Sequence, residues 1–420
     1  MKFLLTTLFC GLPLLLATTP AHAQGAGHER FHKQYRVEHR HDLSSNDYVL
    51  LDFADLDGDG YPEMLYSDPY YQEVGGRDFE AGRVMIYDGK TGDQLFEIQG
   101  PGISARLGVT AHFLDDITGD GIPDFSLTDQ YQFAYHLHLF SGADFSPLID
   151  SSQHDRFYDV ISVGDQNGDG LSELAAIRTS AWFGPSIQII DGSDLSMILI
   201  KSTRDVSLNL TRLGDLDGDG LEEVGTYRAI APFQEDRSMV LRGANLRTMQ
   251  RFQSEVKDFS LLANAGDVDA DGVNDVFASH AYWDHLGIEE SGLVKVISGA
   301  TGNILALHFG ETHDRIGGFM STLGDLNADG HSEYLIGSKI LSQGSGFGNH
   351  PQEVRIFSGA THTPLDSLFA RDIYYGYGDK AIATYPETST QKAFIGFANS
   401  YRRRFATPMV TVLHAFRFGN

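Results

Sequence analysis

The stretch Asp215-Leu-Asp-Gly-Asp-Gly-Leu-Glu-Glu223 carries most of the information in this 420-residue chain. Acidic residues stand at its first, third, fifth and ninth positions, so alternate side chains of a tight turn can face one cation. The glycine at the sixth position, Gly220, permits the backbone conformation that such a turn needs. A carbonyl oxygen at the seventh position and the carboxylate at the ninth would complete an oxygen shell of the kind that calcium prefers. The stretch therefore predicts a calcium-binding loop.

The same nine-residue pattern begins six times, at Asp55, Asp116, Asp165, Asp215, Asp267 and Asp325. We expect about six calcium ions with a structural role. The seventh residue of each loop would contribute its backbone carbonyl. The second loop has the weakest pattern, because a threonine stands at its third position. The predicted ligands, loop by loop, are Asp55, Asp57, Asp59, Tyr61, Glu63; Asp116, Thr118, Asp120, Ile122, Asp124; Asp165, Asn167, Asp169, Leu171, Glu173; Asp215, Asp217, Asp219, Leu221, Glu223; Asp267, Asp269, Asp271, Val273, Asp275; and Asp325, Asn327, Asp329, His331, Glu333.

Other readings of the acidic loops make different predictions. An EF-hand needs a bidentate carboxylate at its twelfth position. None of the six loops has one, since that position holds Tyr66, Leu127, Ala176, Thr226, Ala278 and Ile336. Acidic turns that bind no metal are the remaining alternative. They would leave three or four carboxylates repelling one another in each loop.

The spacing of the loops predicts a repeated β architecture. Their starts lie 49 to 61 residues apart, a period suited to propeller blades or solenoid coils. Each loop leads into a short strand with alternating or largely apolar residues, and a later strand ends in glycine, at Gly89, Gly142, Gly192, Gly243, Gly299 and Gly359. Each repeat therefore holds about four strands, and such a unit repeated around an axis is a propeller blade. We predict an all-β fold, a seven-bladed β-propeller with calcium-binding loops in six blades.

The two ends of the chain define the domain. Residues 24–420 form a single predicted propeller, in which a seventh unit after Gly359 lacks the aspartate ladder near residues 376–379. A strand candidate at residues 34–39 precedes the first blade, and we expect it to complete the seventh. Such closure removes exposed sheet edges.

Residues 1–23 have the pattern of a secretory signal peptide: a lysine, an apolar stretch and a small-residue cleavage site after Ala23. The apolar stretch is too short for a membrane span. The only cysteine, Cys10, lies in this leader, so the exported protein would carry no disulfide. We therefore expect a periplasmic or extracellular protein in which calcium provides the stabilisation that disulfides often give.

The net charge limits the range of partners. A formal charge of −26 argues against nucleic acid or an anionic membrane as a partner. Ligand positions in the six loops hold 21 of the 57 acidic residues, so much of this charge is local to the loops.

The acidic loops and their flanks resemble the FG-GAP repeats of the integrin alpha-subunit propeller, most clearly over Arg315-Ile-Gly-Gly-Phe-Met-Ser-Thr-Leu-Gly-Asp-Leu-Asn-Ala-Asp-Gly-His-Ser-Glu-Tyr-Leu-Ile-Gly337. The resemblance covers nearly all of residues 24–420, and secreted bacterial-type proteins with these repeats are the nearer comparison. It departs from the pattern at the Phe-Gly element, which is Leu107-Gly108 or Ile316-Gly317 here. The resemblance implies the propeller fold, calcium and a role in cell adhesion.

The turns on the face opposite the loops are rich in aromatic residues. Rigid aromatics with a few charged partners suit sugar stacking or a protein contact. The alternative is that they pack the turns together. The predicted ligand-binding residues are Tyr71, Tyr135, Trp182, Phe183, Trp283 and Arg403.

Two groups of histidines have a structural and a functional reading. His28, His32, His39 and His41 have spacings compatible with a transition-metal clip or with a solvated leader. The sequences His154-Asp155-Arg156 and His313-Asp314-Arg315 recur at equivalent turns between blades, where they would pair within the ring or act in catalysis.

The leading functional hypothesis is a secreted calcium-binding propeller that acts as a binding or adhesion module for a glycan or protein surface. The rival is a polysaccharide lyase or hydrolase on the same scaffold, because fold does not decide function. The sequence shows no catalytic motif, and we assign no catalytic residue. A structural subunit of an envelope assembly is a third reading, which predicts a broad flat patch in place of a pocket.

Overall fold

The computed structural model describes residues 31–42, 50–71, 80–131, 134–148, 156–179, 185–202, 210–228, 237–249, 261–338, 353–369, 381–385, 392–400 and 408–418. Every helix or strand assigned within those residues is a β-strand. The predicted all-β class is therefore confirmed. The predicted signal peptide and the turn near residues 376–379 lie outside the described residues.

The described strands form seven antiparallel sheets. In six of them the strands follow one another in chain order, so each sheet is built from one stretch of sequence. These sheets are β2 (Leu50–Ala54), β3 (Glu63–Asp68), β4 (Arg83–Tyr87), β5 (Gln94–Gln99); β6 (Thr110–Phe113), β7 (Phe125–Asp129), β8 (His136–Phe140); β9 (Phe157–Ser162), β10 (Leu174–Arg178), β11 (Ser186–Ile190), β12 (Met197–Ser202); β13 (Leu210–Gly214), β14 (Glu223–Arg228), β15 (Arg237–Leu241); β16 (Leu261–Gly266), β17 (Asp275–His280), β18 (Leu293–Ile297), β19 (Ile304–Phe309); and β20 (Ile316–Gly324), β21 (Glu333–Ser338), β22 (Glu353–Phe357), β23 (Pro364–Phe369).

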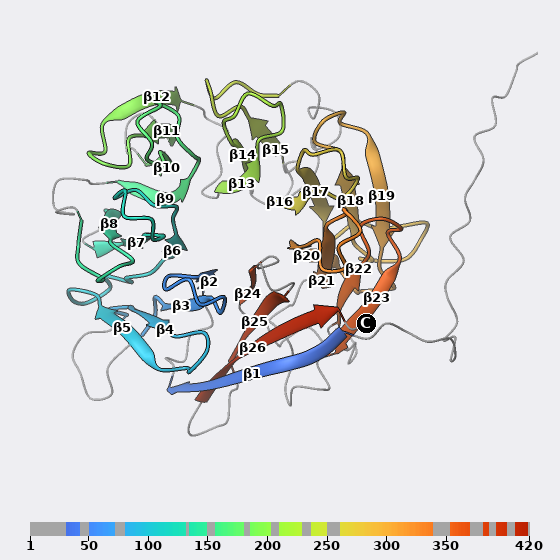
Figure 1. Ribbon diagram of the computed structural model, residues 1–420, viewed down its shortest axis with the longest axis horizontal. Coiled ribbons are helices and arrows are strands. Elements are labelled where there is room, and N and C mark those ends of the chain that lie inside the picture. Colours follow the sequence, from blue (N-terminus) through green and yellow to red (C-terminus); the bar gives the residue numbers. More distant parts are fainter. Residues whose placement is uncertain are drawn as a thin grey trace, which may run out of the picture.

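The seventh sheet combines the two ends of the described chain. It contains β1 (Phe31–Asp42), β26 (Pro408–Phe418), β25 (Lys392–Ser400) and β24 (Ala381–Tyr385), in that order. Strand β1 pairs antiparallel with β26, from Phe31 opposite Phe418 to Asp42 opposite Pro408. Figure 1 shows this pair as the blue and red strands that lie side by side.

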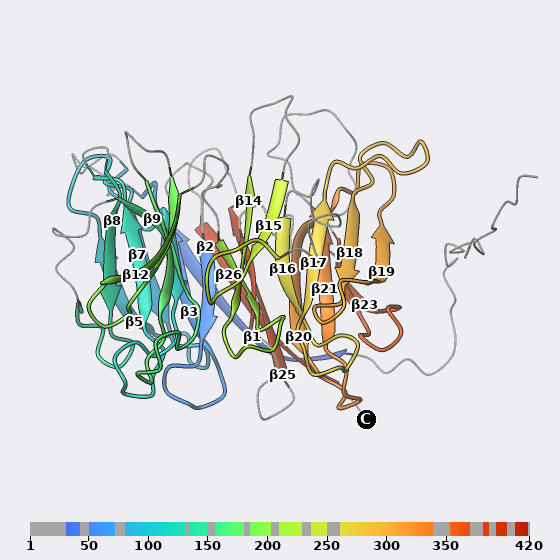
Figure 2. The same ribbon diagram turned by 90° about the horizontal axis from the view of Figure 1, so that it is seen from above.

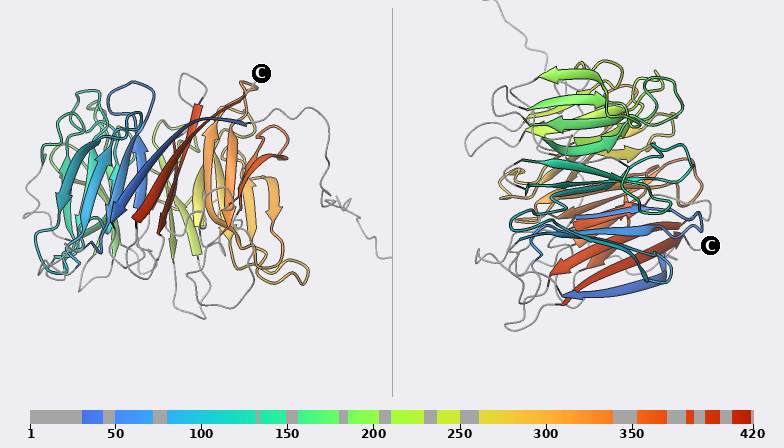
Figure 3. Two further views of the ribbon diagram at one scale, coloured as in Figure 1. Left: turned by 90° about the horizontal axis from the view of Figure 1, so that it is seen from below. Right: turned by 90° about the vertical axis from the view of Figure 1, so that its left-hand side faces the viewer.

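The sheets stand around a common axis. The first strand of each sheet contacts the first strand of the next, through β2, β6, β9, β13, β16, β20 and β24, and β24 returns to β2. Figures 1 and 3 show the resulting ring from its end and from its sides. Outer strands such as β12 and β19 have mainly exposed and half-buried residues, as expected at the rim.

The hydrophobic core lies between neighbouring sheets. Leu65, Val84 and Ile86 of the first sheet pack with Phe125 and Leu127 of the second, and all five are fully buried. Equivalent clusters join the second sheet to the third, the third to the fourth, the fourth to the fifth and the fifth to the sixth. Sheets packed face to face in this way bury the inner and middle strands and leave the rim accessible.

The acidic loops connect the first strand of each sheet to the second, in six of the sheets. Because all six make the same connection, they lie at one end of the ring, and the β17–β18 loop lies at the other (Figure 2). The glycine that ends the third strand packs directly against this connection. A Cβ on Gly142 would lie 1.8 Å from the carbonyl oxygen of Pro123, and one on Gly299 would lie 1.9 Å from that of Asn274. The repeated glycine is therefore a requirement of close packing against the loop.

Candidate metal sites

The first aspartate of each loop fixes the backbone of the turn. In the fourth loop, Asp215 Oδ1 accepts a hydrogen bond from the N–H of Gly218 at 2.7 Å, and Oδ2 accepts one from Gly220 at 2.9 Å. Gly220 has a φ of 87°, which favours glycine. The first and third loops repeat this arrangement around Asp55 and Asp165.

Four of the six loops bring three carboxylates together, with one oxygen from each lying within 4.8 Å of the others. These oxygens are close enough to share a single cation. The groups are Asp55, Asp57, Glu63; Asp165, Asp169, Glu173; Asp215, Asp217, Glu223; and Asp267, Asp269, Asp271. In the loops that begin at Asp116 and Asp325, all of whose residues are described, the carboxylates are not grouped in this way.

The ninth carboxylate is buried beneath its loop. Glu223 is fully buried, and its Oε2 accepts a hydrogen bond from the N–H of Leu216 at 2.5 Å. Burial raises the pKa of Glu223 to about 7, and the negative charges of Asp217, Asp219 and Asp215 add to this effect. Burial likewise raises the pKa of Glu63 to about 7 and that of Glu333 to about 8. The loops therefore hold buried carboxylates whose negative charge is disfavoured by burial and by neighbouring carboxylates.

The fourth loop also contains buried oxygens without hydrogen-bond partners. Glu223 Oε1 and Asp217 Oδ1 are inaccessible to solvent and have no partner among the described residues. Asp269 Oδ1 in the fifth loop is in the same state. Burying a carboxylate oxygen without a partner costs free energy. A positively charged partner, such as a bound cation, would remove this cost. Carboxylate and carbonyl oxygens on a tight turn fit a hard divalent cation such as calcium.

The second loop satisfies its own carboxylates. Asp116 Oδ1 accepts hydrogen bonds from the N–H groups of Thr118 and Gly119, and Oδ2 accepts one from Gly121. Although partial burial acts in the opposite direction, these N–H groups hold the pKa of Asp116 below its usual value. Asp124 uses Oδ2 for Ile117 and Oδ1 for Gly142.

Charged side chains on the inner strands form a second polar site that the sequence patterns did not reveal. His112 on β6 lies between Asp159 on β9, at 3.1 Å from Nε2 to Oδ1, and Asp52 on β2, at 3.9 Å from Nδ1 to Oδ2. Burial would lower the pKa of His112, but the hydrogen bond and charge of Asp159, with the charge of Asp52, raise it overall. The one sequence feature that could have indicated this site is a histidine, His112, within a short and mainly apolar strand.

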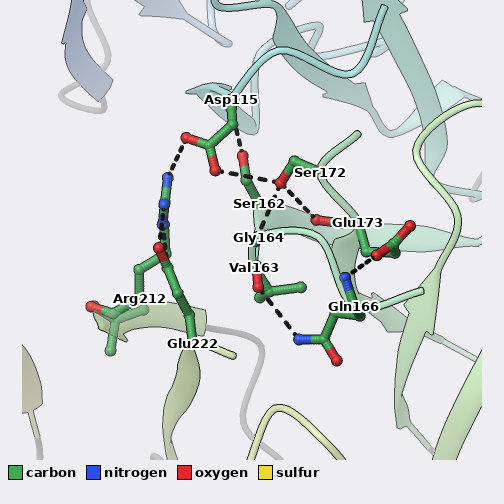
Figure 4. A network of polar contacts seen from close by, with 10 residues as sticks. Asp115, Ser162, Val163, Gly164, Gln166, Ser172, Glu173, Arg212 and Glu222 are labelled. Carbon is green, nitrogen blue, oxygen red and sulfur yellow. Dashed lines mark hydrogen bonds and ion pairs between the residues drawn. The ribbon is translucent and has the colours of Figure 1, made fainter. Parts of the chain in front are cut away.

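Arg212 on β13 connects this inner wall to the loops. Its Nη1 donates to Asp115 Oδ1 at 2.8 Å, and its Nε and Nη2 donate to the two carboxylate oxygens of Glu222. Figure 4 shows Arg212 between these two carboxylates, and Ser172 of the third loop beside Asp115. Arg212 thus joins the second and fourth sheets across the third.

The predicted ligand-binding residues have different surroundings. Tyr71 packs beneath Arg83, whose guanidinium carbon lies 3.9 Å from the ring centroid. The ring of Tyr135 packs edge-on against Tyr158, with 4.8 Å between centroids. Trp283 is 42% exposed. Trp182, Phe183 and Arg403 lie outside the described residues.

The β17–β18 loop presents Trp283 on a braced backbone. The N–H of Trp283 donates to the carbonyl of His280, and its own carbonyl accepts hydrogen bonds from Gly292 and Ser291. Beside it, Tyr282 and Leu286 are 44% and 90% exposed. These three are the large exposed apolar side chains of this loop, and we call them its exposed patch.

The second His-Asp-Arg sequence pairs within the ring. His313 Nδ1 lies 3.3 Å from Glu290 Oε2, and Arg315 donates to the same oxygen. Of the first sequence, His154 and Asp155 lie outside the described residues. Of the N-terminal histidines, His28 also lies outside them, whereas His32, His39 and His41 fall within β1.

In the part of the chain that the structure describes, there is no helix with the length and apolarity to cross a membrane. No known protein family matches this chain. No curated protein sequence matches it either.

One solved structure shares the fold at low identity, and two others show a weaker similarity. The crystal structure of BBS1N in complex with ARL6DN, soaked with mercury, is similar with a TM-score of 0.54 and 9% identity, over 93% of this chain and 97% of that chain. The same complex soaked with lead gives 0.49 and 11% over the same shares, and rhamnogalacturonan lyase YesW gives 0.43 and 14% over 81% of this chain and 60% of that chain. The ring of antiparallel sheets is of the β-propeller type.

Proposed function

We propose that this protein is an exported seven-bladed β-propeller of the FG-GAP type, stabilised by calcium in those acidic loops whose carboxylates lie close together. In this proposal it binds a glycan or protein surface through the end of the ring opposite those loops. The ions lock the connections between the first and second strands, because a cation that binds only the folded chain stabilises it.

One observation carries the calcium part of this proposal: the buried oxygens of Asp217 and Glu223 that have no partner among the described residues. An acidic turn that bound no metal would be expected to satisfy its buried oxygens, as the second loop does. A divalent ion in the fourth loop would neutralise the crowded negative charge, and both oxygens would coordinate it.

The calcium part is tested by metal content and thermal stability. We expect calcium to co-purify with the protein, and excess EGTA to lower the melting temperature by roughly 10 °C, as expected when several kcal/mol of ion binding are lost. Replacing Asp217 and Asp219 with alanine should remove about one ion per chain, whereas the exposed Ala143→Ser should remove none. A melting temperature that EGTA leaves unchanged would contradict the proposal.

The ligand-binding part rests on the exposed patch of the β17–β18 loop. Tyr282 and Trp283 are large, partly exposed and held on a braced turn. Aromatic side chains in such positions contribute strongly to binding at low entropic cost. Arg315, whose guanidinium lies 5.7 Å from the Tyr282 ring centroid, adds a charged neighbour.

A glycan array, read for both binding and product release, tests this part. We expect Trp283→Ala to abolish binding that the wild type shows. Ile200→Ala, an exposed site on the rim strand β12, should leave that binding unchanged. Release of shortened glycans would favour a polysaccharide-degrading enzyme over a binding module.

A further inference from the structure

The residue before each strand-closing glycine lies beside the acidic loop of the same sheet. The glycine packs closely against the eighth residue of the loop, and this contact positions the preceding residue beside the loop. For Gly243, a Cβ would lie 2.4 Å from the carbonyl oxygen of Glu222. The six residues at this position are Asp88, Ser141, Asp191, Arg242, Ser298 and Ser358.

In two sheets this residue contacts the third position of the loop. Arg242 Nη1 donates to Asp217 Oδ2 in the fourth loop. Asp191 Oδ2 accepts a hydrogen bond from Asn167 Nδ2 at 3.1 Å in the third loop. The same structural position thus offers a cation or an anion to a candidate metal ligand.

Arg242 has a fixed backbone and a partly exposed side chain. Its backbone is held in a turn, where its N–H donates to Arg247 and its carbonyl accepts from Leu246. Its side chain is 39% exposed, whereas Asp217 is only 6% exposed. The guanidinium pairs with one oxygen of Asp217, while Asp217 Oδ1 and Glu223 Oε1 keep no partner among the described residues. The tethered charge therefore neutralises the loop only in part.

We propose that Arg242 is a built-in competitor for the divalent cation of the fourth loop, and that Asp191 at the same position strengthens cation binding in the third. This inference rests on the proposed function, since it concerns the affinity of the same loops for calcium. The guanidinium must leave Asp217 Oδ2, or share its carboxylate, when a cation binds. In the third loop the additional carboxylate increases the negative charge around the site. The two loops therefore differ in affinity because of a residue outside the nine-residue pattern.

Calcium titration of variants at this position tests the inference. We compare wild type, Arg242→Ser and Arg242→Gln by isothermal titration with CaCl2 after EGTA treatment. Each is repeated with Glu223→Gln, which assigns a change to the fourth loop. We expect both Arg242 variants to bind the fourth-loop ion about tenfold more tightly, because the variant removes a positive charge that repels the incoming cation and occupies one of its ligands. Asp191→Ser should lower the calcium affinity of the third loop several-fold.

Arg247→Ser is the matched control, because it removes an exposed arginine from the same turn. We expect it to change calcium affinity less than twofold. Circular dichroism and thermal melting in EGTA establish that each variant is folded. Equal tightening by Arg247→Ser, or none by either Arg242 variant, would overturn the competitor role. Folded wild-type protein that binds no calcium at all would instead overturn the proposed function, and the inference with it.

Discussion

The fourth and second acidic loops have the same backbone and differ in which oxygens they leave free. In both, the first aspartate accepts hydrogen bonds from the residues at the fourth and sixth positions. Gly220 and Gly121 have nearly equal φ values, 87° and 85°. The fourth loop nevertheless has two buried oxygens without partners among the described residues, and the second loop, all of which is described, groups no carboxylates. The nine-residue pattern thus specifies a turn, and further features decide its capacity for a cation.

The ninth residue is one of these features. Glu223 accepts a hydrogen bond from Leu216 with Oε2, and its longer side chain leaves Oε1 beneath the loop without a partner in the described part of the chain. Asp124 is shorter and uses both oxygens on backbone N–H groups. Asp275 of the fifth loop does the same, with Val268 and Gly299. The fifth loop still forms a group, but from its first, third and fifth residues.

The largest expected effect tests what the two loops share. Gly142→Ala and Gly243→Ala would each push a Cβ into the carbonyl of the adjoining loop, at 1.8 and 2.4 Å. We expect each to reduce the free energy of unfolding by about 3 kcal/mol. Urea denaturation should show the loss in calcium and in EGTA alike, and Ala143→Ser should show none. A loss confined to one of the two loops would mean that their packing differs.

The second-largest expected effect is calcium-dependent and distinguishes the fourth loop from the second. Glu223→Gln should reduce stability by about 2.7 kcal/mol when calcium is present at a hundred times its dissociation constant, because the ion is lost. In EGTA the same variant should be as stable as wild type or more so, since it removes a crowded buried charge.

Asp124→Asn is the matched variant in the second loop. Its amide cannot accept from both Ile117 and Gly142, so we expect a loss of about 1–2 kcal/mol. This loss should be equal with and without calcium when measured by the same urea titrations. If Asp124→Asn instead lost stability only in calcium, the second loop would be a metal site.

A gain-of-binding variant sharpens the role of the third position. Thr118→Asp gives the second loop the acidic residues of the fifth, Asp-x-Asp-x-Asp-Gly-x-x-Asp. We expect one additional calcium ion per chain by elemental analysis, and a calcium-dependent gain of roughly 1 kcal/mol. Thr118→Asn serves as the uncharged control. An unchanged ion count would show that the third residue does not limit calcium binding by the second loop.

The smallest effect concerns the inner wall, which should not respond to calcium. The raised pKa of His112 means that its ion pairs stabilise the fold fully below the unfolded value near 6.5, and less as pH rises through the folded value. His112→Gln should therefore cost about 1 kcal/mol at pH 5.5 and less at pH 9, by urea denaturation in EGTA. A cost that increased with pH would contradict the raised pKa of His112.

The sequence allowed the all-β class and the position of the acidic loops to be predicted, because both follow from local pattern. Strand β3 begins at Glu63 and β14 at Glu223, the ninth residues of their loops, where alternation indicated a strand. Arg242 was not predictable as a partner of Asp217. It lies 25 residues away in sequence, and only the packing of Gly243 on the loop brings them together. The contact between His112 and Asp159 depends on the ring in the same way.

The central claim is that the fourth loop holds a calcium ion and the second does not. A crystal structure grown in calcium, with anomalous data at long wavelength, tests it most directly. We predict an anomalous peak about 2.3–2.6 Å from Asp217 Oδ1 and Glu223 Oε1, and none in the loop that begins at Asp116. A fourth loop without a peak, or peaks of equal height in both loops, would contradict this account.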